Sequence, residues 1–279
     1  MGSVSFERAA SFYDATRGYA PGTAERICAA IVARTGATRQ TRFLELGVGT
    51  GRIALPFLAA GYSYVGIDLA ASMLAVLREK AATAASQPML VRGDVTRLPF
   101  ADASFDVALG VHVLHLVADW RATLAEARRA LRPRAHLLLA GDVRPEDEPQ
   151  VDVAILLPPA QAHHAWRAAL AALGLTGHEG QPGAVRLSDP AVTQALVDLG
   201  ATVEQVDLAE YERLPMSARD VVRGYRERIY SSDWARPDDL HAAAVARLER
   251  WLAEEGADPD TPHVVRGRFT GLLATWGAA

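Results

Sequence analysis

Short apolar runs alternate with amphipathic segments along the first half of the chain. The apolar runs predict five strands, at 43–46, 62–68, 89–91, 107–111 and 135–140. Between them, apolar residues recur with helical spacing, for example from Ile53 and after Asp119, which is placed to cap its helix. Strands that alternate with helices form parallel sheets with right-handed crossovers. The pattern therefore predicts an α/β domain.

The pattern is less regular before residue 38 and after residue 143. Apolar periodicity predicts two more strands, at 201–208 and 264–275. It also predicts helices at 5–16, 160–173, 188–199, 216–231 and 237–255. Ser188 is placed to cap the third of these helices, with Pro190 early in it. The added segments therefore lie after the fifth strand and between the sixth and seventh.

The composition excludes several classes of partner. Half of the 279 residues are hydrophobic, which is enough for a sizeable core. The net charge of −4 gives no basic field, so no nucleic-acid partner is expected. No run approaches the roughly 20 apolar residues that span a membrane, so no membrane partner is expected either. Cys28 is the only cysteine, which excludes an internal disulfide and fits a reducing, cytoplasmic location.

A glycine-rich turn follows the first strand. Its sequence is Glu45-Leu46-Gly47-Val48-Gly49-Thr50-Gly51-Arg52. Glycine adopts positive φ and lets a ligand lie directly on the main chain. A dinucleotide-binding fold would have its third glycine where Arg52 stands, and the chain has no P-loop motif. A turn of this kind after a buried strand indicates a nucleotide-type site.

Acidic residues follow the second and third strands. Asp68 ends the second strand about 20 residues after Gly47, the distance expected between a glycine-rich turn and a ribose-binding carboxylate. Met73, on the next helix, is placed to pack against a base, and Asp94 is placed to accept from the base's exocyclic amine. The alternative for either acid is that it only caps a helix or turn.

Together these features resemble the class I S-adenosylmethionine (SAM)-dependent methyltransferases. The subgroup that is most similar contains small-molecule methyltransferases, including the quinone-biosynthesis C-methyltransferases. The resemblance covers residues 8–142 and rests on four motifs in order: Glu45-x-Gly47-x-Gly49-x-Gly51, Asp68, Gly93-Asp94 and Asp102-x-Ser104-Phe105-Asp106. It implies a Rossmann-like, seven-stranded, mostly parallel sheet with helices on both faces and an antiparallel last strand. It also implies SAM as the cofactor and S-adenosylhomocysteine (SAH) as its product.

The resemblance further implies which residues hold the donor. The ribose would lie on Asp68, the methionine part on the turn from Gly47 to Gly51, and the adenine beside Asp94. Tyr13 and Arg17 match a segment that closes over the donor in the family; the alternative for this segment is a surface helix with ordinary packing. The full set of implied contacts is Tyr13, Arg17, Glu45, Gly47, Val48, Gly49, Gly51, Asp68, Leu69, Met73, Asp94, Val95, Val111 and His112.

His112 and His115 flank the end of the fourth strand, a position that faces the reactive centre in this fold. Each is a candidate general base, and the alternative for each is a packed histidine with one backbone hydrogen bond. None of His112, His115, His163 and His164 has acidic neighbours at a convincing metal-ligand spacing, so no metal site is expected. Methyl transfer needs an in-line nucleophile and, where required, removal of a proton. The sequence therefore leaves open whether an O, N or C atom attacks.

The expected organisation is a single methyltransferase domain over residues 1–279. Its SAM-binding core would comprise about 38–145, 186–213 and 261–279, and a helical cap over the acceptor pocket would comprise about 1–36, 146–185 and 214–260. Aromatic residues of the cap, such as Tyr225 and Trp251, fit either a helix core or an acceptor pocket. The expected function is methyl transfer from SAM to a small-molecule acceptor. The alternatives are another reaction on the same fold, a protein acceptor, or a SAM-binding module without catalysis.

Overall fold

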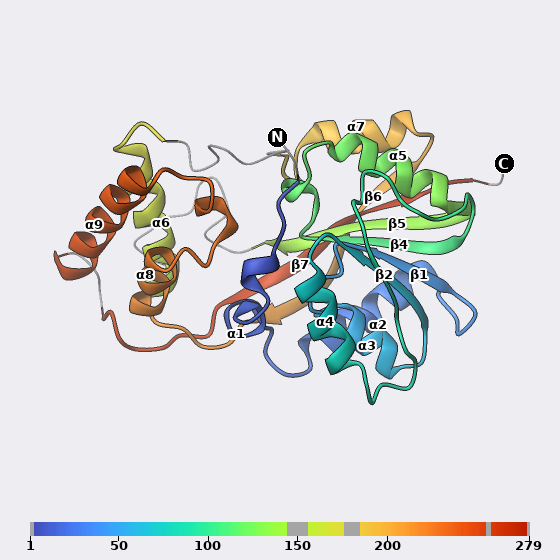
Figure 1. The fold of residues 1–279 in the computed structure, drawn as a ribbon, viewed down its shortest axis with the longest axis horizontal. Helices are drawn as coiled ribbons and strands as arrows, with labels where there is room; N and C mark the ends of the chain where they lie inside the picture. The colour runs from blue at the N-terminus through green and yellow to red at the C-terminus, as the bar shows by residue number, and fades with distance from the viewer. Residues whose placement is uncertain (1–2, 144–155, 176–184, 255–257, 278–279) are drawn as a thin grey trace. The chain divides into compact units, whose positions relative to one another are not determined.

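The computed structural model describes residues 3–143, 156–175, 185–254 and 258–277 (Figure 1). The chain divides into two compact units. The first unit comprises Met1–Asp142, Pro182–Glu210 and Arg268–Ala279. The second comprises Val143–Gln181 and Tyr211–Gly267, so the chain leaves the first unit after its fifth strand and again within its sixth.

A seven-stranded sheet in the order β3-β2-β1-β4-β5-β7-β6 carries the first unit. The strands are β1 (Arg42–Leu46), β2 (Ser63–Asp68), β3 (Met89–Arg92), β4 (Phe105–Val111), β5 (Leu131–Val143), β6 (Thr202–Glu212) and β7 (Arg266–Thr275). The first five strands pair in parallel, and the sheet also contains an antiparallel pair. The expected Rossmann-like, mostly parallel sheet is confirmed. Because the strand order reverses between β1 and β4, a ligand-binding crevice is expected where these strands end.

Helices cover both faces of this sheet (Figure 1). One face carries α5 (Trp120–Ala130) and α7 (Pro190–Asp198), and the other carries α2 (Thr23–Thr35), α3 (Ala54–Ala59) and α4 (Ala71–Lys80). None of the described helices combines the length and apolar character that a membrane span requires.

Two apolar layers fix these helices to the sheet. Leu124 of α5 and Leu196 of α7 are fully buried in the same cluster as Leu44 of β1. On the other face, Phe57 of α3 packs against Phe43 of β1 with ring centroids 4.7 Å apart. Burying one such side chain contributes about 1.5–3 kcal/mol. The sequence therefore builds a rigid sheet whose strand ends are held in register.

Two local predictions are wrong. The single helix expected at 5–16 is a 3-10 turn, Glu7–Ala9, followed by the short helix α1, Tyr13–Arg17. The Glu7 carboxylate instead accepts hydrogen bonds from the backbone of α4, a tertiary contact that local periodicity does not report. The cap of α7 is Asp189, whose Oδ1 accepts from the Ala191 amide at 2.9 Å, and not Ser188.

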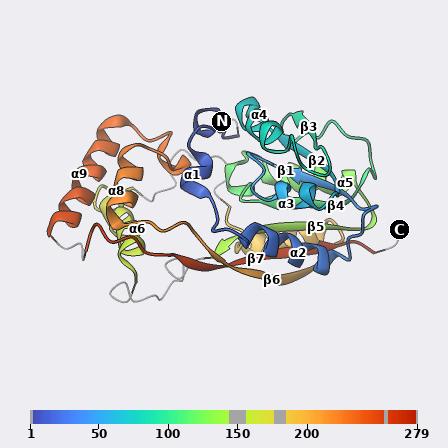
Figure 2. The same ribbon diagram turned by 90° about the horizontal axis from the view of Figure 1, so that it is seen from below.

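The second unit contains the helices α6 (Pro158–Ala171), α8 (Ala218–Arg226) and α9 (Asp238–Glu254), which pack side by side (Figure 1, Figure 2). Its core is partly aromatic, because Trp166 and Tyr225 are buried and stack with centroids 4.3 Å apart. Beside them lies the buried ion pair of Arg236 and Asp233. For Tyr225 the structure supports the helix-core interpretation.

Candidate functional site

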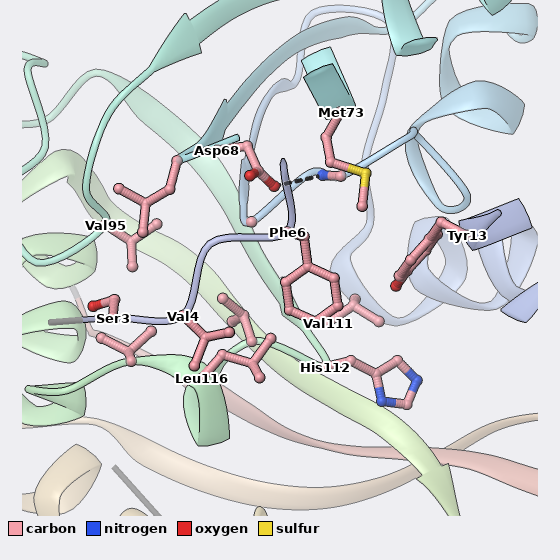
Figure 3. Close-up of a pocket in the computed structure, with 15 residues that line it drawn as sticks. Ser3, Val4, Phe6, Tyr13, Asp68, Met73, Val95, Val111, His112 and Leu116 are labelled. Atoms are coloured by element: carbon pink, nitrogen blue, oxygen red, sulfur yellow. Dashed lines mark hydrogen bonds between the residues drawn. The ribbon is translucent and has the colours of Figure 1, made fainter. Parts of the chain in front are cut away.

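A cavity lies where β1, β2 and β4 end (Figure 3). It encloses about 600 Å³ of space when the open solvent at its mouth is included. Nine of the predicted contacts line it: Tyr13, Gly47, Gly49, Asp68, Leu69, Met73, Val95, Val111 and His112. The sequence missed six further lining residues: Ser3, Val4, Phe6, Val113, Leu116 and Val117. The cavity is thus mostly apolar, with a few polar groups.

The glycine-rich turn contributes main chain to this cavity. Gly49 has φ +55°, and a Cβ built on it would meet no atom within 4 Å, so its open side faces the cavity that it lines. Gly51 has a different role. A Cβ there would lie 2.2 Å from Cδ1 of Leu77, so glycine at this position allows α4 to pack against the turn. Gly49 therefore leaves room for a ligand, whereas Gly51 lets the turn and α4 approach each other closely.

Asp68 joins the end of β2 to the glycine-rich turn. Its Oδ2 accepts from the Gly49 amide at 2.9 Å (Figure 3). Its Oδ1 accepts from the Ala70 amide, also at 2.9 Å. Burial raises the pKa of Asp68, although these backbone hydrogen bonds oppose the shift. Each carboxylate oxygen has a further lone pair, so both can still accept from a ligand hydroxyl. The turn-capping and ligand-binding interpretations of Asp68 are therefore compatible.

His112 occupies an unusual backbone conformation at the end of β4. Its φ is +53°, a region that side chains other than glycine rarely adopt and that is concentrated at functional sites. The His112 Nε2 lies 3.1 Å from Oδ1 of Asp142, whose side chain is only 3% exposed. The Tyr19 hydroxyl donates to the same carboxylate oxygen at 2.8 Å. The imidazole at the cavity therefore has a buried acid beside its Nε2.

The sequence did not identify Asp142 or Tyr19 as site residues. Asp142 directly follows the apolar run of the fifth strand, and that position was the one available signal. The hydrogen bond between Tyr19 and Asp142 joins positions 123 residues apart, which no local pattern can report. The predicted base His115 lies in a short 3-10 turn and is not among the residues that line the cavity.

Five predicted contacts do not line the cavity, namely Arg17, Glu45, Val48, Gly51 and Asp94. Val48 instead packs on β2, since a Cβ at Gly66 would lie 2.7 Å from its Cγ1. Asp94 Oδ1 accepts from the amide and the hydroxyl of Thr96, both at 2.9 Å, which is the turn-capping alternative. The Arg17 carbonyl accepts from the Arg52 guanidinium at 2.7 Å.

Glu45 is a buried structural acid. It is 3% exposed, and its Oε2 accepts from the Tyr64 hydroxyl at 2.7 Å. Burial raises the pKa of Glu45 to about 8, although the hydrogen bond from Tyr64 lowers it. Its carboxyl group therefore holds a proton at neutral pH and couples β1 to β2 beneath the turn.

Arg52, which follows the glycine-rich turn, contacts both main chain and side chain of the segment ahead of β1. Besides its bond to the Arg17 carbonyl, the guanidinium lies over the Tyr19 ring, 4.5 Å from the centroid. Arg52 thus ties the segment ahead of β1 to the turn. Among the residues that the structure describes, no group of three His, Cys, Asp or Glu side chains is placed to hold a metal ion.

Residues 44–139 match a sequence family described as a methyltransferase domain. The sheet that these residues build has the fold of the class I SAM-dependent methyltransferases. SAM is the cofactor of this domain, and the cavity fits it. The open side of Gly49 leaves room for a ligand on the main chain, and Asp68 offers acceptors for a ribose diol. The apolar side chains of Leu69 and Val95 offer faces for a base.

The methyltransferase domain has curated relatives at modest identity. A demethylmenaquinone methyltransferase of Renibacterium salmoninarum is 31% identical over 141 residues, which cover 50% of this chain and 57% of that protein. The ubiquinone/menaquinone biosynthesis C-methyltransferase UbiE of Paracoccus denitrificans is 36% identical over 142 residues, 48% of this chain and 56% of that protein. The chain thus spans about half the length of the curated relatives it matches.

Solved structures share the fold of the methyltransferase domain. The YcgJ protein of Bacillus subtilis has a TM-score of 0.56 at 18% identity, with 91% of this chain and 99% of that chain covered. The [4+2]-cyclase SpnF has a TM-score of 0.55 at 17% identity, with 100% and 98% covered. At such identities the similarity shows the fold alone, and the chemistry must be argued from the site.

Proposed function

We propose that this protein transfers the methyl group of SAM to a small-molecule acceptor, with His112 as the general base. The observation that carries the proposal is the pairing of His112 with Asp142 at a cavity that also contains Gly49 and Asp68. Donor-binding groups and a candidate base thus line one cavity. The quinone-biosynthesis names of the two relatives above support a small-molecule acceptor.

On the donor side, each proposed role follows from the position of the residue. Asp68 would accept hydrogen bonds from both ribose hydroxyls, and the main chain at Gly49 would lie against the methionine part. Leu69 and Val95 would enclose the adenine, and Met73 would pack beside it. When bound, SAM supplies a sulfonium-activated methyl group. The cavity must exclude water and hold the acceptor in line with that group.

On the acceptor side, His112 would take the proton that the nucleophile loses. Proton transfer to the imidazole makes a cation, and the buried carboxylate of Asp142 would stabilise it and fix the orientation of the ring. Tyr19 would hold Asp142 through its hydrogen bond. This arrangement suits a nucleophile that must be deprotonated, such as a phenolic or enolic hydroxyl or an acidic carbon. Val111 and Leu116 make the same cavity favourable for an apolar acceptor.

The test is transfer of a labelled methyl group. The protein is incubated with SAM that carries a trideuterated methyl group and with a panel of phenols, quinols, carbon acids and amines, and the products are analysed by mass. The expected result is a labelled product from a hydroxyl or carbon acceptor, with SAH released in equal amount. General-base catalysis contributes about 10²–10⁴-fold, so His112→Ala should lose about that factor in kcat while it still binds SAH. Asp142→Asn should lose less.

Two results would contradict the proposal. Conversion of an acceptor without gain of the label would indicate another reaction on the same fold, as the similarity to a cyclase structure illustrates. Full turnover by His112→Ala would remove His112 from the chemistry and leave methyl transfer without a base.

A further inference from the structure

The N-terminal segment forms one wall of the cavity. Val4, Phe6 and Tyr13 line the cavity, and the rings of Phe6 and Tyr13 meet edge to face with centroids 6.0 Å apart. Figure 3 shows the Phe6 ring beside Val111 and His112. The Val4 amide donates to the Leu116 carbonyl at 2.9 Å, which fixes the start of the segment to the loop after β4. A ligand in this cavity would therefore be covered by residues of the N-terminal segment, from Val4 to Tyr13.

The next residue after Phe6 anchors this wall to the start of α4. Glu7 Oε1 accepts from the Ala71 amide at 2.6 Å, and its Oε2 accepts from the Ser72 amide at 3.0 Å. The Ser72 hydroxyl also donates to the Glu7 carbonyl at 3.1 Å. Hydrogen bonds from Ser72 and Ala71 hold the pKa of Glu7 below its ordinary value. A carboxylate at this point also complements the positive end of the helix dipole.

The next residue after Tyr13 anchors the wall to the other end of α4. Asp14 Oδ2 accepts from Nζ of Lys80, the last residue of the helix and the only lysine of the chain, at 2.9 Å. Asp14 Oδ1 accepts from the Thr50 hydroxyl at 2.7 Å, and Lys80 Nζ also donates to the Thr50 carbonyl at 2.8 Å. The second anchor thus includes the glycine-rich turn.

The two anchors follow one pattern. Each aromatic residue of the wall, Phe6 or Tyr13, is followed by an acid that is bound to one end of α4, and Met73 of the same helix lines the cavity. We propose that Glu7 and Asp14 are positioning residues that hold the wall of residues 3–14 against α4 and so set how long the donor or its product stays bound. This inference rests on the proposed function, because it takes SAM and SAH as the occupants.

The physical consequence concerns rates. A covered ligand leaves only after the wall moves, and lids of this kind can limit product release. Loss of either anchor frees the neighbouring aromatic ring, so SAH should dissociate faster. Because the anchors act on Phe6 and Tyr13 and do not touch the ligand, their loss should change the dissociation rate more than the association rate.

The test measures the dissociation rate of SAH by stopped-flow displacement and the hydrogen exchange of residues 3–14. The variants are Glu7→Ala, Glu7→Gln and Asp14→Asn. Glu79→Gln is the matched control, since Glu79 is an exposed acid on the same helix. Loss of a helix-capping side chain changes the folding equilibrium of a helix or protein by roughly fivefold. We expect Glu7→Ala and Asp14→Asn to release SAH about fivefold faster, Glu7→Gln to be intermediate, and Glu79→Gln to match the wild type.

A second comparison shows whether Glu7 acts through Phe6. Phe6→Leu should also release SAH faster, and adding Glu7→Ala to it should raise the rate by less than the two separate factors multiplied. Fully multiplicative effects would contradict a role for Glu7 in positioning that ring. A residue with a purely structural role would show no such coupling.

The possible failures are distinguishable. If the wild type binds SAH and the anchor variants release it at the wild-type rate, the proposed role of Glu7 and Asp14 is wrong and the proposed function stands. If the wild type does not bind SAH, the proposed function fails. In that case faster exchange of residues 3–14 in ligand-free Glu7→Ala would still support the anchors, and unchanged exchange would reject them too.

Discussion

Glu45 and Asp68 lie near the ends of the neighbouring strands β1 and β2, but their carboxyl groups have different surroundings. Glu45 is fully enclosed and its one hydrogen bond comes from the Tyr64 hydroxyl, so burial dominates and its pKa rises to about 8. Asp68 accepts two backbone hydrogen bonds and faces the cavity. The first acid therefore contributes to the architecture of the strands, whereas the second can meet a ligand.

The buried Glu45 predicts a specific pH dependence of stability. Between its ordinary pKa of 4.5 and about 8, the folded protein holds a proton that the unfolded chain has released. The free energy of unfolding of the wild type should therefore fall as pH rises through this range. Glu45→Gln removes the titration and retains an oxygen for the Tyr64 hydroxyl, so its stability should be flatter and higher than that of the wild type by roughly 1–3 kcal/mol at pH 7.

Urea unfolding at pH 5, 6, 7 and 8 measures this difference. Glu204→Gln is a suitable control, because Glu204 is exposed and its ion pair with Arg34 is on the surface. Parallel curves for the wild type and Glu45→Gln would show that Glu45 is not protonated in the folded state.

Single residues differ in how far the sequence can locate them. Asp68 was predictable because a strand end and a glycine-rich turn are local patterns, and both are encoded within about 20 residues. The contact of His112 with Asp142 and Tyr19 joins three distant segments, so only the folded sheet brings these residues together. Asp94 was predicted from its place after the third strand, and the structure shows its carboxylate capping the turn at Thr96, which was the stated alternative.

Secondary-structure elements were predictable wherever burial was periodic. The strands and most helices lie within a few residues of their expected bounds, because each has one face in an apolar core. The helix expected at 5–16 was wrong because Phe6 and Glu7 make contacts with the cavity and with α4 instead of with their own turn. Element boundaries that depend on one side chain, such as the cap of α7, were also not encoded in the periodicity.

The α7 boundary yields a prediction with a neighbouring control. Asp189→Ala removes the acceptor of the Ala191 amide, so it should lower the free energy of unfolding by about 1 kcal/mol. Ser188→Ala should change it by less than about 0.5 kcal/mol, since Ser188 is exposed and does not cap the helix. Chemical denaturation of the two variants measures both values. A larger loss for Ser188→Ala than for Asp189→Ala would reverse the assignment.

At the scale of the whole molecule, three separate stretches of chain build the first unit and two build the second. Within the first unit, the strand order brings the ends of β1, β2 and β4 to one cavity, and the N-terminal segment lines it as well. The α/β pattern was sufficient to predict this architecture, because alternating strands and helices leave few topologies. The role of the second unit as a cap over the acceptor stays a prediction.

The central claim is that SAM and its product bind in this cavity with the ribose on Asp68, and calorimetric titration with SAH tests it most directly. The account predicts saturable one-to-one binding to the wild type and at least about tenfold weaker binding to Asp68→Asn, which loses a charged acceptor. Asp106→Asn is the matched control, because Asp106 also accepts a backbone amide, that of Arg42 at 2.8 Å, at the opposite end of its strand. It should bind SAH like the wild type. Absence of saturable binding to the wild type, or equal affinity for Asp68→Asn, would contradict the account.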